Sequence, residues 1–564
     1  MIYTVRADTS NPKYSVPASG GAAGSGSDVV SESQAYGLMI TGLVLASWQT
    51  HSAVTDPNLN TVLTTFHGLF NGWRDMCENS SHSAGCQTGG TFCNGGSEIC
   101  LPGWKHNGDL TTEVGTGSAP DGDEDAIVGM ILALKAVDAM GLSVSWYNEV
   151  SEWAEASCTS FLYHNTVTQG NYRLVKLGSC WGGFDGNGQN PSYHSPGSYK
   201  LMRDFQSDFS SSDRSYSLPS GLSNLDDAWN KVIDTSYEAL SVFQCPDYGL
   251  VPNWARIQID STTGDLEINP GSFTGSGTPQ NEYGSEAART TWRVALDAAL
   301  YPGEVTMDAV PFMSPLLSKL EDGHTGSPNL YFSSTTLNSC NLDTAGMITI
   351  FGSWQYNAFI YGPTFSSLIV PSNNIAAATQ QNMIDDAGTR LAADTSSSYY
   401  PRAWKLLSIL MLNGAAEAAG IVAASGSPLT GAPVPVSSAP VTLSPVTSAP
   451  VASPATPAPV QATPAPVPPT GGNCQMCCSL SSTNGCPSWD NACFTEENCG
   501  VSPSCQWDSQ QWVEECDDGS GCCAQNGVCV TGTDPCFEYG KCGIDDASQG
   551  IWCSWGGQLS WIAN

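Results

Sequence analysis

The sequence is poor in positive charge. Its 564 residues include 19 lysines and arginines against 53 aspartates and glutamates, which gives a formal net charge of −34. A surface this acidic repels the phosphates of nucleic acids and of anionic lipids, so we expect neither a nucleic acid nor a membrane as a partner. Solubility or a saline habitat explains the acidity more simply than a particular substrate does.

Long apolar runs are also lacking. The run LMITGLVLA at 38–46 is shorter than the roughly 20 residues that span a bilayer. The first thirty residues contain no apolar segment of the kind found in secretory leaders. We therefore expect no membrane anchor, and we expect a mature form from which a leader has been removed.

Histidine is scarce, whereas cysteine is abundant. The chain has 7 histidines, none of them after His324, and 22 cysteines, fourteen of which follow residue 473. The tail lacks paired C-x-x-C modules at the spacing of structural zinc sites, so we expect no metal and no other cofactor. An even number of cysteines in each part favours disulfides formed in an oxidising compartment, and hence a secreted, extracellular protein. The eight cysteines before the tail are Cys77, Cys86, Cys93, Cys100, Cys158, Cys180, Cys245 and Cys340.

Charged residues are missing altogether between Glu417 and Asp490. Within this stretch, residues 426–472 consist mainly of Pro, Ala, Val, Thr and Ser, and ATPAPV occurs twice. Such a composition cannot bury a core and is typical of an extended linker. We therefore predict three parts: a large first domain over 1–425, a linker over 426–472 and a Cys-rich, Trp-rich module over 473–564.

The module at 473–564 combines its cysteines with many aromatic residues. These are Trp507, Trp512, Trp552, Trp555 and Trp561, with Phe537 and Tyr539. Some of them must fill the small core of a disulfide-rich unit. The others could form a flat face that binds polysaccharide and, through the linker, raises the effective concentration of that polysaccharide at the first domain. The sequence leaves the ligand of this module open.

Apolar residues recur at helical spacing throughout the first 425 residues, and strand-like alternation is scarce. This periodicity predicts an all-α domain. The pattern alone leaves a helical toroid and a plain bundle open. The predicted helical segments are 34–48, 123–140, 147–164, 225–243, 286–300, 344–361 and 400–422.

Four segments carry side chains suited to chemistry, and each also has a simpler interpretation. Glu32, in SESQAYGLM at 31–39, could be only a helix-start charge that interacts with the helix dipole. The acids of APDGDED at 119–125 could be a helix cap. They lack the spacing of an EF-hand, which argues against a calcium loop of that type. Glu286 and Arg289 could be a structural ion pair on one helix face. The fourth segment, NPSYHSP at 190–196, is a turn that presents aromatic side chains.

Taken together and in this order, the segments resemble glycoside hydrolase family 8 over about residues 30–420. The family blocks S-E-G-Q-x-Y-G-M and A-[ST]-D-[AG]-D are similar to 31–39 and 119–123. N-P-S-Y-F-S-P and Y-D-A-x-R-T-P-W-R are similar to 190–196 and 285–293. The departures of this chain from the blocks include Pro120, His194, Ser285, Glu286 and Thr291.

The resemblance implies an (α/α)6 barrel and an inverting, endo-acting enzyme on β-1,4-linked polysaccharide, with cellulose or a related β-glucan as the first candidate. Xylan and chitosan remain open as substrates, and a monomer is expected. Glu32 would be the general acid, Asp121 would bind and distort the sugar next to the scissile bond, and Arg289 would orient a carboxylate or a sugar hydroxyl. Trp104, Tyr193 and Tyr399 would contact sugar rings.

The general base is the position at which this sequence departs most from the family. Glu286 stands where the family has its catalytic Asp and is one methylene longer, and a misplacement of ~1 Å can reduce a rate about 100-fold. Glu286 could still be the base, or a loop acid, Glu282 or Asp185, could replace it. A third alternative is that the chain is a non-catalytic polysaccharide-binding protein on the same scaffold.

Overall fold

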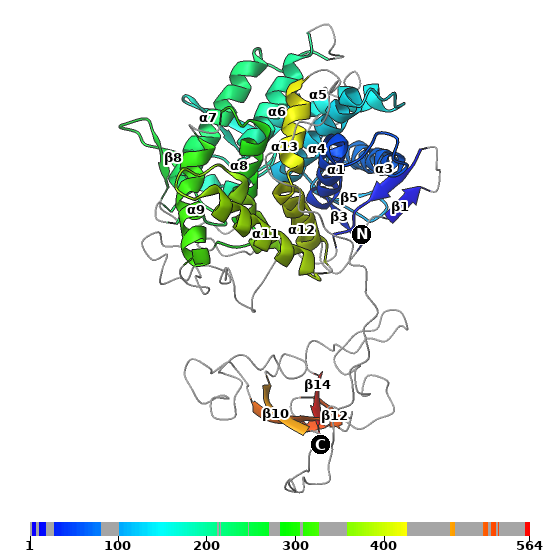
Figure 1. Ribbon diagram of the computed structural model, residues 1–564, viewed down its shortest axis with the longest axis vertical. Helices are drawn as coiled ribbons and strands as arrows, with labels where there is room; N and C mark the ends of the chain where they lie inside the picture. The colour runs from blue at the N-terminus through cyan, green and yellow to red at the C-terminus, as the bar shows by residue number, and fades with distance from the viewer. Residues whose placement is uncertain are drawn as a thin grey trace. The chain divides into compact units, whose positions relative to one another are not determined.

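The computed structural model divides the chain into two compact units, residues 1–445 and 446–564 (Figure 1). In the first unit it describes residues 3–6, 11–18, 27–80, 101–210, 214, 216–245, 248–269, 283–304, 308–325, 358–396 and 398–425. In the second unit it describes five short strands. The three-part division predicted from the sequence stays a prediction.

The first unit is built mainly of α-helices, as predicted (Figure 1). The longer helices are α1 (Ser31–Ala46), α3 (Asn58–Glu78), α4 (Pro120–Ala139), α5 (Tyr147–His164), α6 (Pro196–Ser207), α7 (Leu225–Phe243), α8 (Ala288–Leu300), α9 (Ala309–Thr325), α10 (Ala358–Ser366), α11 (Ala377–Ala393), α12 (Tyr399–Leu412) and α13 (Ala415–Ser425). One-turn helices are α2 (Trp48–His51), η2 (Asp185–Asn187), η3 (Pro191–Tyr193) and η5 (Ser367–Ile369).

Six of these helices form a closed ring. α1 packs against α4, α4 against α6, α6 against α8, α8 against α10, α10 against α12, and α12 returns to α1. The intervening helices α3, α5, α7, α9 and α11 each pack on the ring helix that precedes them. This alternation of ring and covering helices is the arrangement of the predicted (α/α)6 barrel.

The ring helices α1 and α4 run in the same direction and are in very close contact. A Cβ atom added to Gly129 would lie 2.5 Å from the backbone of Leu38, and one added to Gly42 would lie 2.5 Å from the Gly129 carbonyl oxygen. Real Cβ atoms do not approach that closely, so only glycine lets the two backbones approach this closely. The contact brings the first turns of both helices to the same end of the ring.

The last helix, α13, closes the opposite end of the ring. It packs against α1, α4, α8 and α12, and it lies among them in Figure 1. A Cβ on Gly420 would meet the carbonyl oxygen of Ala299 at 2.7 Å, close to the end of α8. The N-terminal ends of the ring helices therefore face away from α13, and the candidate site lies there.

Short strands before and between the helices pair into small antiparallel sheets. β1 (Tyr3–Arg6) pairs with β2 (Lys13–Ser15), and β3 (Val29–Val30), β4 (Lys105–His106) and β5 (Glu113–Gly115) form a three-stranded sheet. β6 (Thr166–Gln169) pairs with β7 (Tyr172–Val175), and β8 (Ile257–Ile259) pairs with β9 (Leu266–Ile268). Among the described residues ahead of α1 there are strands and no helix.

The helix predictions are confirmed in most segments and wrong in part. Residues 400–422 form two helices bent by 67° rather than one, because Gly414 adopts a left-handed backbone with φ of 77°. The sequence reading also missed α3, α6, α9 and α11. Of the predicted segment 344–361, only its last residues are described, where α10 begins.

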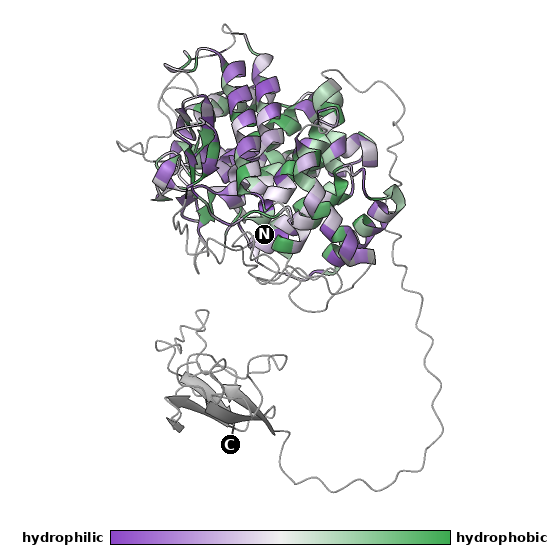
Figure 2. Ribbon diagram, turned by 90° about the vertical axis from the view of Figure 1, so that its left-hand side faces the viewer, coloured by the Kyte–Doolittle hydropathy of each residue, from purple (hydrophilic) through white to green (hydrophobic). Residues whose placement is uncertain are grey.

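Apolar and polar residues are mixed along the helices of this unit (Figure 2), because each helix turns its apolar side to the core. Five tryptophans are among the largest fully buried side chains. These are Trp73, Trp153, Trp229, Trp292 and Trp404. Among the described residues no single helix is long and apolar enough to cross a membrane. The bent pair α12–α13 reaches that length and hydropathy only when its two helices are counted together.

The cysteines of the first unit are not all paired. Cys77 and Cys158 are buried free thiols, so an even count does not make every cysteine a disulfide partner. Cys180 and Cys245 are disulfide-bonded. The remaining four predicted disulfide cysteines, Cys86, Cys93, Cys100 and Cys340, lie outside the described residues.

The second unit is described only in its strands. β10 (Cys474–Ser479) pairs with β11 (Gln511–Cys516) in an antiparallel ladder. β12 (Gly521–Gln525) lies between β13 (Val528–Cys529) and β14 (Leu559–Ala563). Of the predicted aromatic face, Trp512 falls in β11 and Trp561 in β14, and the other five aromatic residues lie outside the described residues.

Candidate active site

Two carboxylates enter the site from the first turns of adjacent ring helices. Glu32 is the second residue of α1, and Asp121 is the second residue of α4 behind Pro120, a residue that suits the first helical position. The side chain of Glu32 is 15% exposed and that of Asp121 is 9% exposed. The sequence prediction that both open a helix is confirmed.

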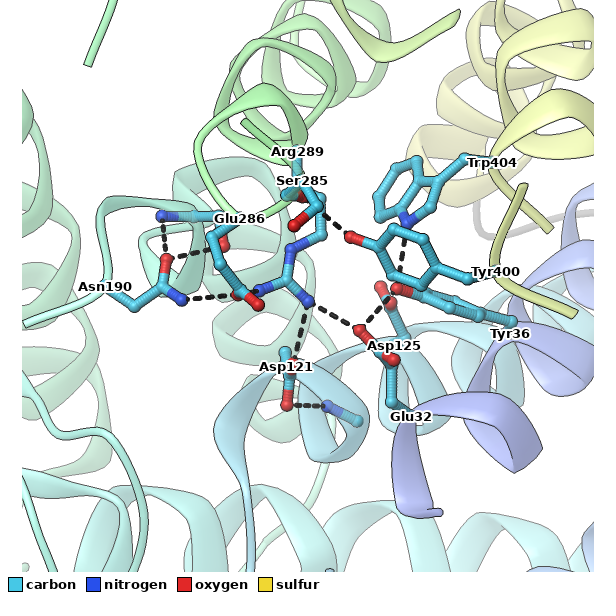
Figure 3. A network of polar contacts seen from close by, with 12 residues as sticks. Glu32, Tyr36, Asp121, Asp125, Asn190, Ser285, Glu286, Arg289, Tyr400 and Trp404 are labelled. Carbon is cyan, nitrogen blue, oxygen red and sulfur yellow. Dashed lines mark hydrogen bonds and ion pairs between the residues drawn. The ribbon is translucent and has the colours of Figure 1, made fainter. Parts of the chain in front are cut away.

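Arg289 joins these two carboxylates to a third. Its Nη1 donates to Glu32 Oε1 at 2.6 Å and to Asp121 Oδ2 at 2.9 Å, and its Nη2 pairs with Glu286 Oε2 (Figure 3). The guanidinium is 1% exposed, and the neighbouring carboxylates, Glu286 foremost, outweigh burial and raise the pKa of Arg289 well above its usual value. The expected Glu286–Arg289 ion pair is therefore present, and it belongs to a larger group.

Glu286 lies just before α8 and is held from a second side. Asn190 Nδ2 donates to Glu286 Oε2 at 2.8 Å (Figure 3). Asn190 is fully buried and precedes the one-turn helix η3, whose Tyr193 ring lies 5.5 Å from the guanidinium carbon of Arg289. The turn 190–193 therefore contacts both the candidate base and the arginine that binds it.

The surroundings of Glu32 favour its protonated form. Burial raises the pKa of Glu32 to about 7, against the opposing charge of Arg289 and with the support of the negative charge of Asp121. Tyr36 Oη donates to Oε1 at 2.7 Å, and Tyr399 Oη contacts Oε2 at 3.1 Å. A carboxyl of this kind can give up a proton near neutral pH.

A second charged layer lies one helical turn below the first. Arg293 pairs through both terminal nitrogens with Asp125, and its Nη2 is 3.2 Å from Glu124. These three side chains and Asp123 are fully buried, and Asp123 accepts a hydrogen bond from Asn165 at 2.7 Å. The acids of 123–125 are therefore core residues rather than solvated charges.

Aromatic side chains enclose the carboxylates on the α12 side. Tyr400 Oη donates to the Ser285 carbonyl at 2.7 Å, and Trp404 Nε1 donates to Tyr36 Oη at 3.0 Å (Figure 3). Tyr399 was predicted to contact a sugar ring, which stays a prediction. Its hydroxyl lies against Glu32, so the side chain belongs to this site. The sequence reading assigned no role to Tyr36, Tyr400 or Trp404, although the apolar face of α12 could have indicated that some of them line the ring.

Trp104 lies beside the start of α1. Its carbonyl accepts from the Ser31 amide at 2.9 Å, and its indole lies against Gly115, where a Cβ would come within 2.3 Å of the ring. A second indole, Trp181, lies against Gly117 and Gly178 and is 39% exposed. Both tryptophans thus flank the segment that leads to Asp121, and the sequence reading missed Trp181 although it stands in a Gly-rich loop.

Of the two alternative bases, only Asp185 is among the residues that the structure describes. Asp185 is exposed, its carbonyl accepts a hydrogen bond from Arg256 at 3.3 Å, and none of its recorded contacts involves Glu32, Asp121 or Arg289. Glu282 lies outside the described residues. Among the described residues no group of three or more His, Cys, Asp or Glu side chains is arranged so that it could hold a metal ion.

Comparison with known proteins gives partial matches to bacterial endoglucanases, and no family model matches the chain. The chain is 25% identical over 260 residues to Endoglucanase C of Ruminiclostridium cellulolyticum, a match covering 44% of this chain and 47% of that protein. It is 26% identical over 207 residues to Endoglucanase 2 of Ruminiclostridium josui, covering 36% of this chain and 35% of that protein. The matches span less than half the length of these relatives.

Among solved structures, a β-1,3-1,4-glucanase from Paenibacillus sp. X4 superposes with a TM-score of 0.49 and 20% identity, over 71% of this chain and 86% of that one. The resemblance to glycoside hydrolase family 8 predicted from the motifs is confirmed by the endoglucanase matches. The chain is therefore similar in sequence to bacterial endoglucanases over less than half of its length.

Proposed function

We propose that this relative of family 8 is a secreted, endo-acting glycoside hydrolase that cleaves a β-1,4-linked polysaccharide with inversion at the anomeric carbon. The observation that carries the proposal is the pairing of two unlike carboxyls on one arginine. Glu32 has a pKa raised to about 7 by burial, and Glu286 is held by Arg289 and Asn190. Glycoside hydrolysis needs one carboxyl group that is protonated, as the acid, and one that is ionised, as the base.

Glu32 is the proposed general acid, and its contacts indicate which oxygen carries the proton. Oε1 already accepts from Tyr36 and from Arg289, so a proton there would clash with two donors. Oε2 contacts only the Tyr399 hydroxyl among the described residues, and a hydroxyl can also accept. The proton therefore belongs on Oε2, from which it passes to the glycosidic oxygen as the bond breaks.

Glu286 is the proposed general base, which accepts a proton from the attacking water. Inversion requires that water to fit between the base and the anomeric carbon, with the two carboxyl groups about 6.5–9.5 Å apart. Arg289 binds both carboxyls and Asp121, so it fixes their spacing. Asp121 is left to bind a sugar hydroxyl beside the scissile bond.

The aromatic residues suit a β-linked chain of sugars. The flat C–H faces of such sugars stack on indole and phenol rings. Trp104 and the exposed Trp181 flank the segment before Asp121, and Tyr193 and Tyr399 contact the charged residues. Cellulose or a related soluble β-glucan is the proposed substrate, and xylan and chitosan are the alternatives to test beside it.

The test is a reducing-sugar assay on carboxymethyl cellulose, mixed-linkage glucan, xylan and chitosan. The wild type should release sugars from at least one of them, and Glu286→Gln and Glu32→Gln should lose turnover while still binding oligosaccharide. Proton NMR of the first product should show the inverted anomer. Near-normal activity in Glu286→Gln would overturn the assignment of the base.

Secretion and a binding role for the C-terminal module belong to the same proposal. The cysteine content supports an oxidising compartment, and the aromatic content of 473–564 supports polysaccharide binding. The full chain should bind insoluble glucan more tightly than a chain ending at residue 425. Equal binding of the two would remove the proposed role of the module.

A further inference from the structure

We propose that Asn190 is a positioning residue that selects which oxygen of Glu286 accepts the proton from water. This inference rests on the proposed function, because it takes Glu286 to be the general base. Asn190 is neither the proposed acid, the proposed base nor the arginine. Its role is indicated by which oxygen of Glu286 accepts the two hydrogen bonds.

Both donors to Glu286 reach the same oxygen. Asn190 Nδ2 lies 2.8 Å from Oε2, and Arg289 Nη2 pairs with that same Oε2. Neither Asn190 nor Arg289 donates to Oε1 of Glu286 in the contacts that the structure describes. The side chain of Glu286 is 19% exposed, so water can reach part of it. With Oε2 occupied, Oε1 is the oxygen left to take a proton.

The amide of Asn190 can present only its nitrogen to Glu286. Its Oδ1 accepts from the Ser192 backbone amide at 2.9 Å and from the Ser192 hydroxyl at 2.8 Å. Rotating the amide by 180° would break both bonds and would point Oδ1 at the carboxylate of Glu286. Because Asn190 is fully buried, water cannot replace the lost contacts. Its orientation is therefore fixed by its own turn.

The turn itself is anchored at both ends. The Gln189 backbone exchanges two hydrogen bonds with Ala255, at 2.8 and 3.0 Å. His194 bridges the Gln189 side chain and the Ser236 hydroxyl, each at 3.1 Å. His194 is fully buried, and burial lowers its pKa to about 3, so the imidazole stays neutral and its two contacts persist at the pH of the assays. Asn190 is thus held in place independently of Glu286.

A simpler role for Asn190 is to cap the helix η3, and substitution separates that role from positioning. The cap uses only Oδ1, which accepts from the Ser192 amide. Asp caps helices about as well as Asn does. Asn190→Asp therefore keeps the cap and the shape of the side chain, and it loses the N–H donor to Glu286. A purely structural Asn190 would tolerate this change.

The experiment measures kcat and KM for carboxymethyl cellulose and cellohexaose against pH, with the full chain. In Asn190→Asp, kcat at pH 7 should fall by about 100-fold, the effect of a base misplaced by ~1 Å. Its activity should recover as the pH falls, because a protonated Asp carboxyl again donates to Glu286. KM should change by less than about threefold, since the substrate contacts remain. The pH optimum should therefore move to more acidic values.

Two further variants serve as controls. Asn187→Asp introduces the same charge in the same loop, on an exposed residue whose side chain donates to the Phe184 carbonyl and to no other described residue, and it should keep the wild-type pH optimum. Asn190→Ser can still cap η3 but is too short to reach Glu286, and it adds no charge. It should lose about tenfold or more in kcat with no acid shift, and it carries the test if Asn190→Asp does not fold.

The outcomes separate this inference from the proposed function. Folded Asn190→Asp and Asn190→Ser proteins with the wild-type kcat and pH optimum would overturn the positioning role, while an inactive Glu286→Gln leaves the base in place. A wild type that cleaves none of the four polysaccharides, or an active Glu286→Gln, would instead overturn the proposed function. An acid-shifted optimum in Asn190→Asp but not in Asn187→Asp supports the inference.

Discussion

Replacing Tyr36 with Phe should shift the pH dependence of catalysis toward alkaline values. The Tyr36 hydroxyl donates to Glu32 Oε1 at 2.7 Å, a bond that stabilises the ionised form of Glu32 and lowers its pKa. A general acid works only when protonated, and burial raises the pKa of Glu32, the proposed acid, to about 7, so activity should decline as the pH rises through about 7. Without the Tyr36 donor the protonated form is favoured, and the decline should occur at higher pH.

The size of the shift follows from the strength of that bond. A hydrogen bond to a charged group contributes about 1.5–3 kcal/mol, and one pKa unit corresponds to about 1.4 kcal/mol. Because Arg289 continues to donate to the same oxygen, the lower end applies, and we expect the alkaline limb of kcat/KM to move up by about one pH unit. The Trp404 N–H also loses its acceptor, at a cost of about 1–3 kcal/mol in folding free energy.

The assay is the pH profile of kcat/KM on the best substrate, with thermal unfolding measured in parallel. Tyr400→Phe is the matched control, because its hydroxyl donates to the Ser285 carbonyl and not to a carboxylate, so its alkaline limb should stay in place. If the limb of folded Tyr36→Phe stayed at the wild-type pH or moved to lower pH, Glu32 would not be the group that sets it. The reasoning about the acid would then be refuted.

Three other predictions concern the fold and the candidate site. Gly129→Ala should destabilise the first unit by about 1–3 kcal/mol, seen as a lower Tm, because its Cβ would lie 2.5 Å from the α1 backbone; Gly388→Ala, where nothing lies within 4 Å, should not lower Tm. Arg293→Met should cost about 3–5 kcal/mol in chemical denaturation, because it leaves Asp125 buried without its partner. Trp181→Ala should weaken oligosaccharide binding, measured by calorimetry, by up to about tenfold and leave the Tm unchanged. Unaltered binding would show that Trp181 does not contact the oligosaccharide.

The sequence by itself determined the local parts of this protein. The 3.6-residue period predicted α5 and α7 to the residue, since each has one apolar face along its whole length. The positions of Glu32 and Asp121 in first helical turns could also be read locally, as could the i, i+3 pairing of Glu286 with Arg289. In each case the signal lies within a few residues of the position that it describes.

Only the tertiary structure decided which of these parts meet. Arg289 contacts Glu32 across 257 positions of sequence, and Asn190 contacts Glu286 across 96. No local pattern encodes such contacts, because they depend on the closure of the helical ring and on the glycine-mediated approach of α1 to α4. Burial, which raises the pKa of Glu32, is likewise a property of the assembled ring. The sequence contains the carboxylates, and the packing of distant helices buries one of them and raises its pKa.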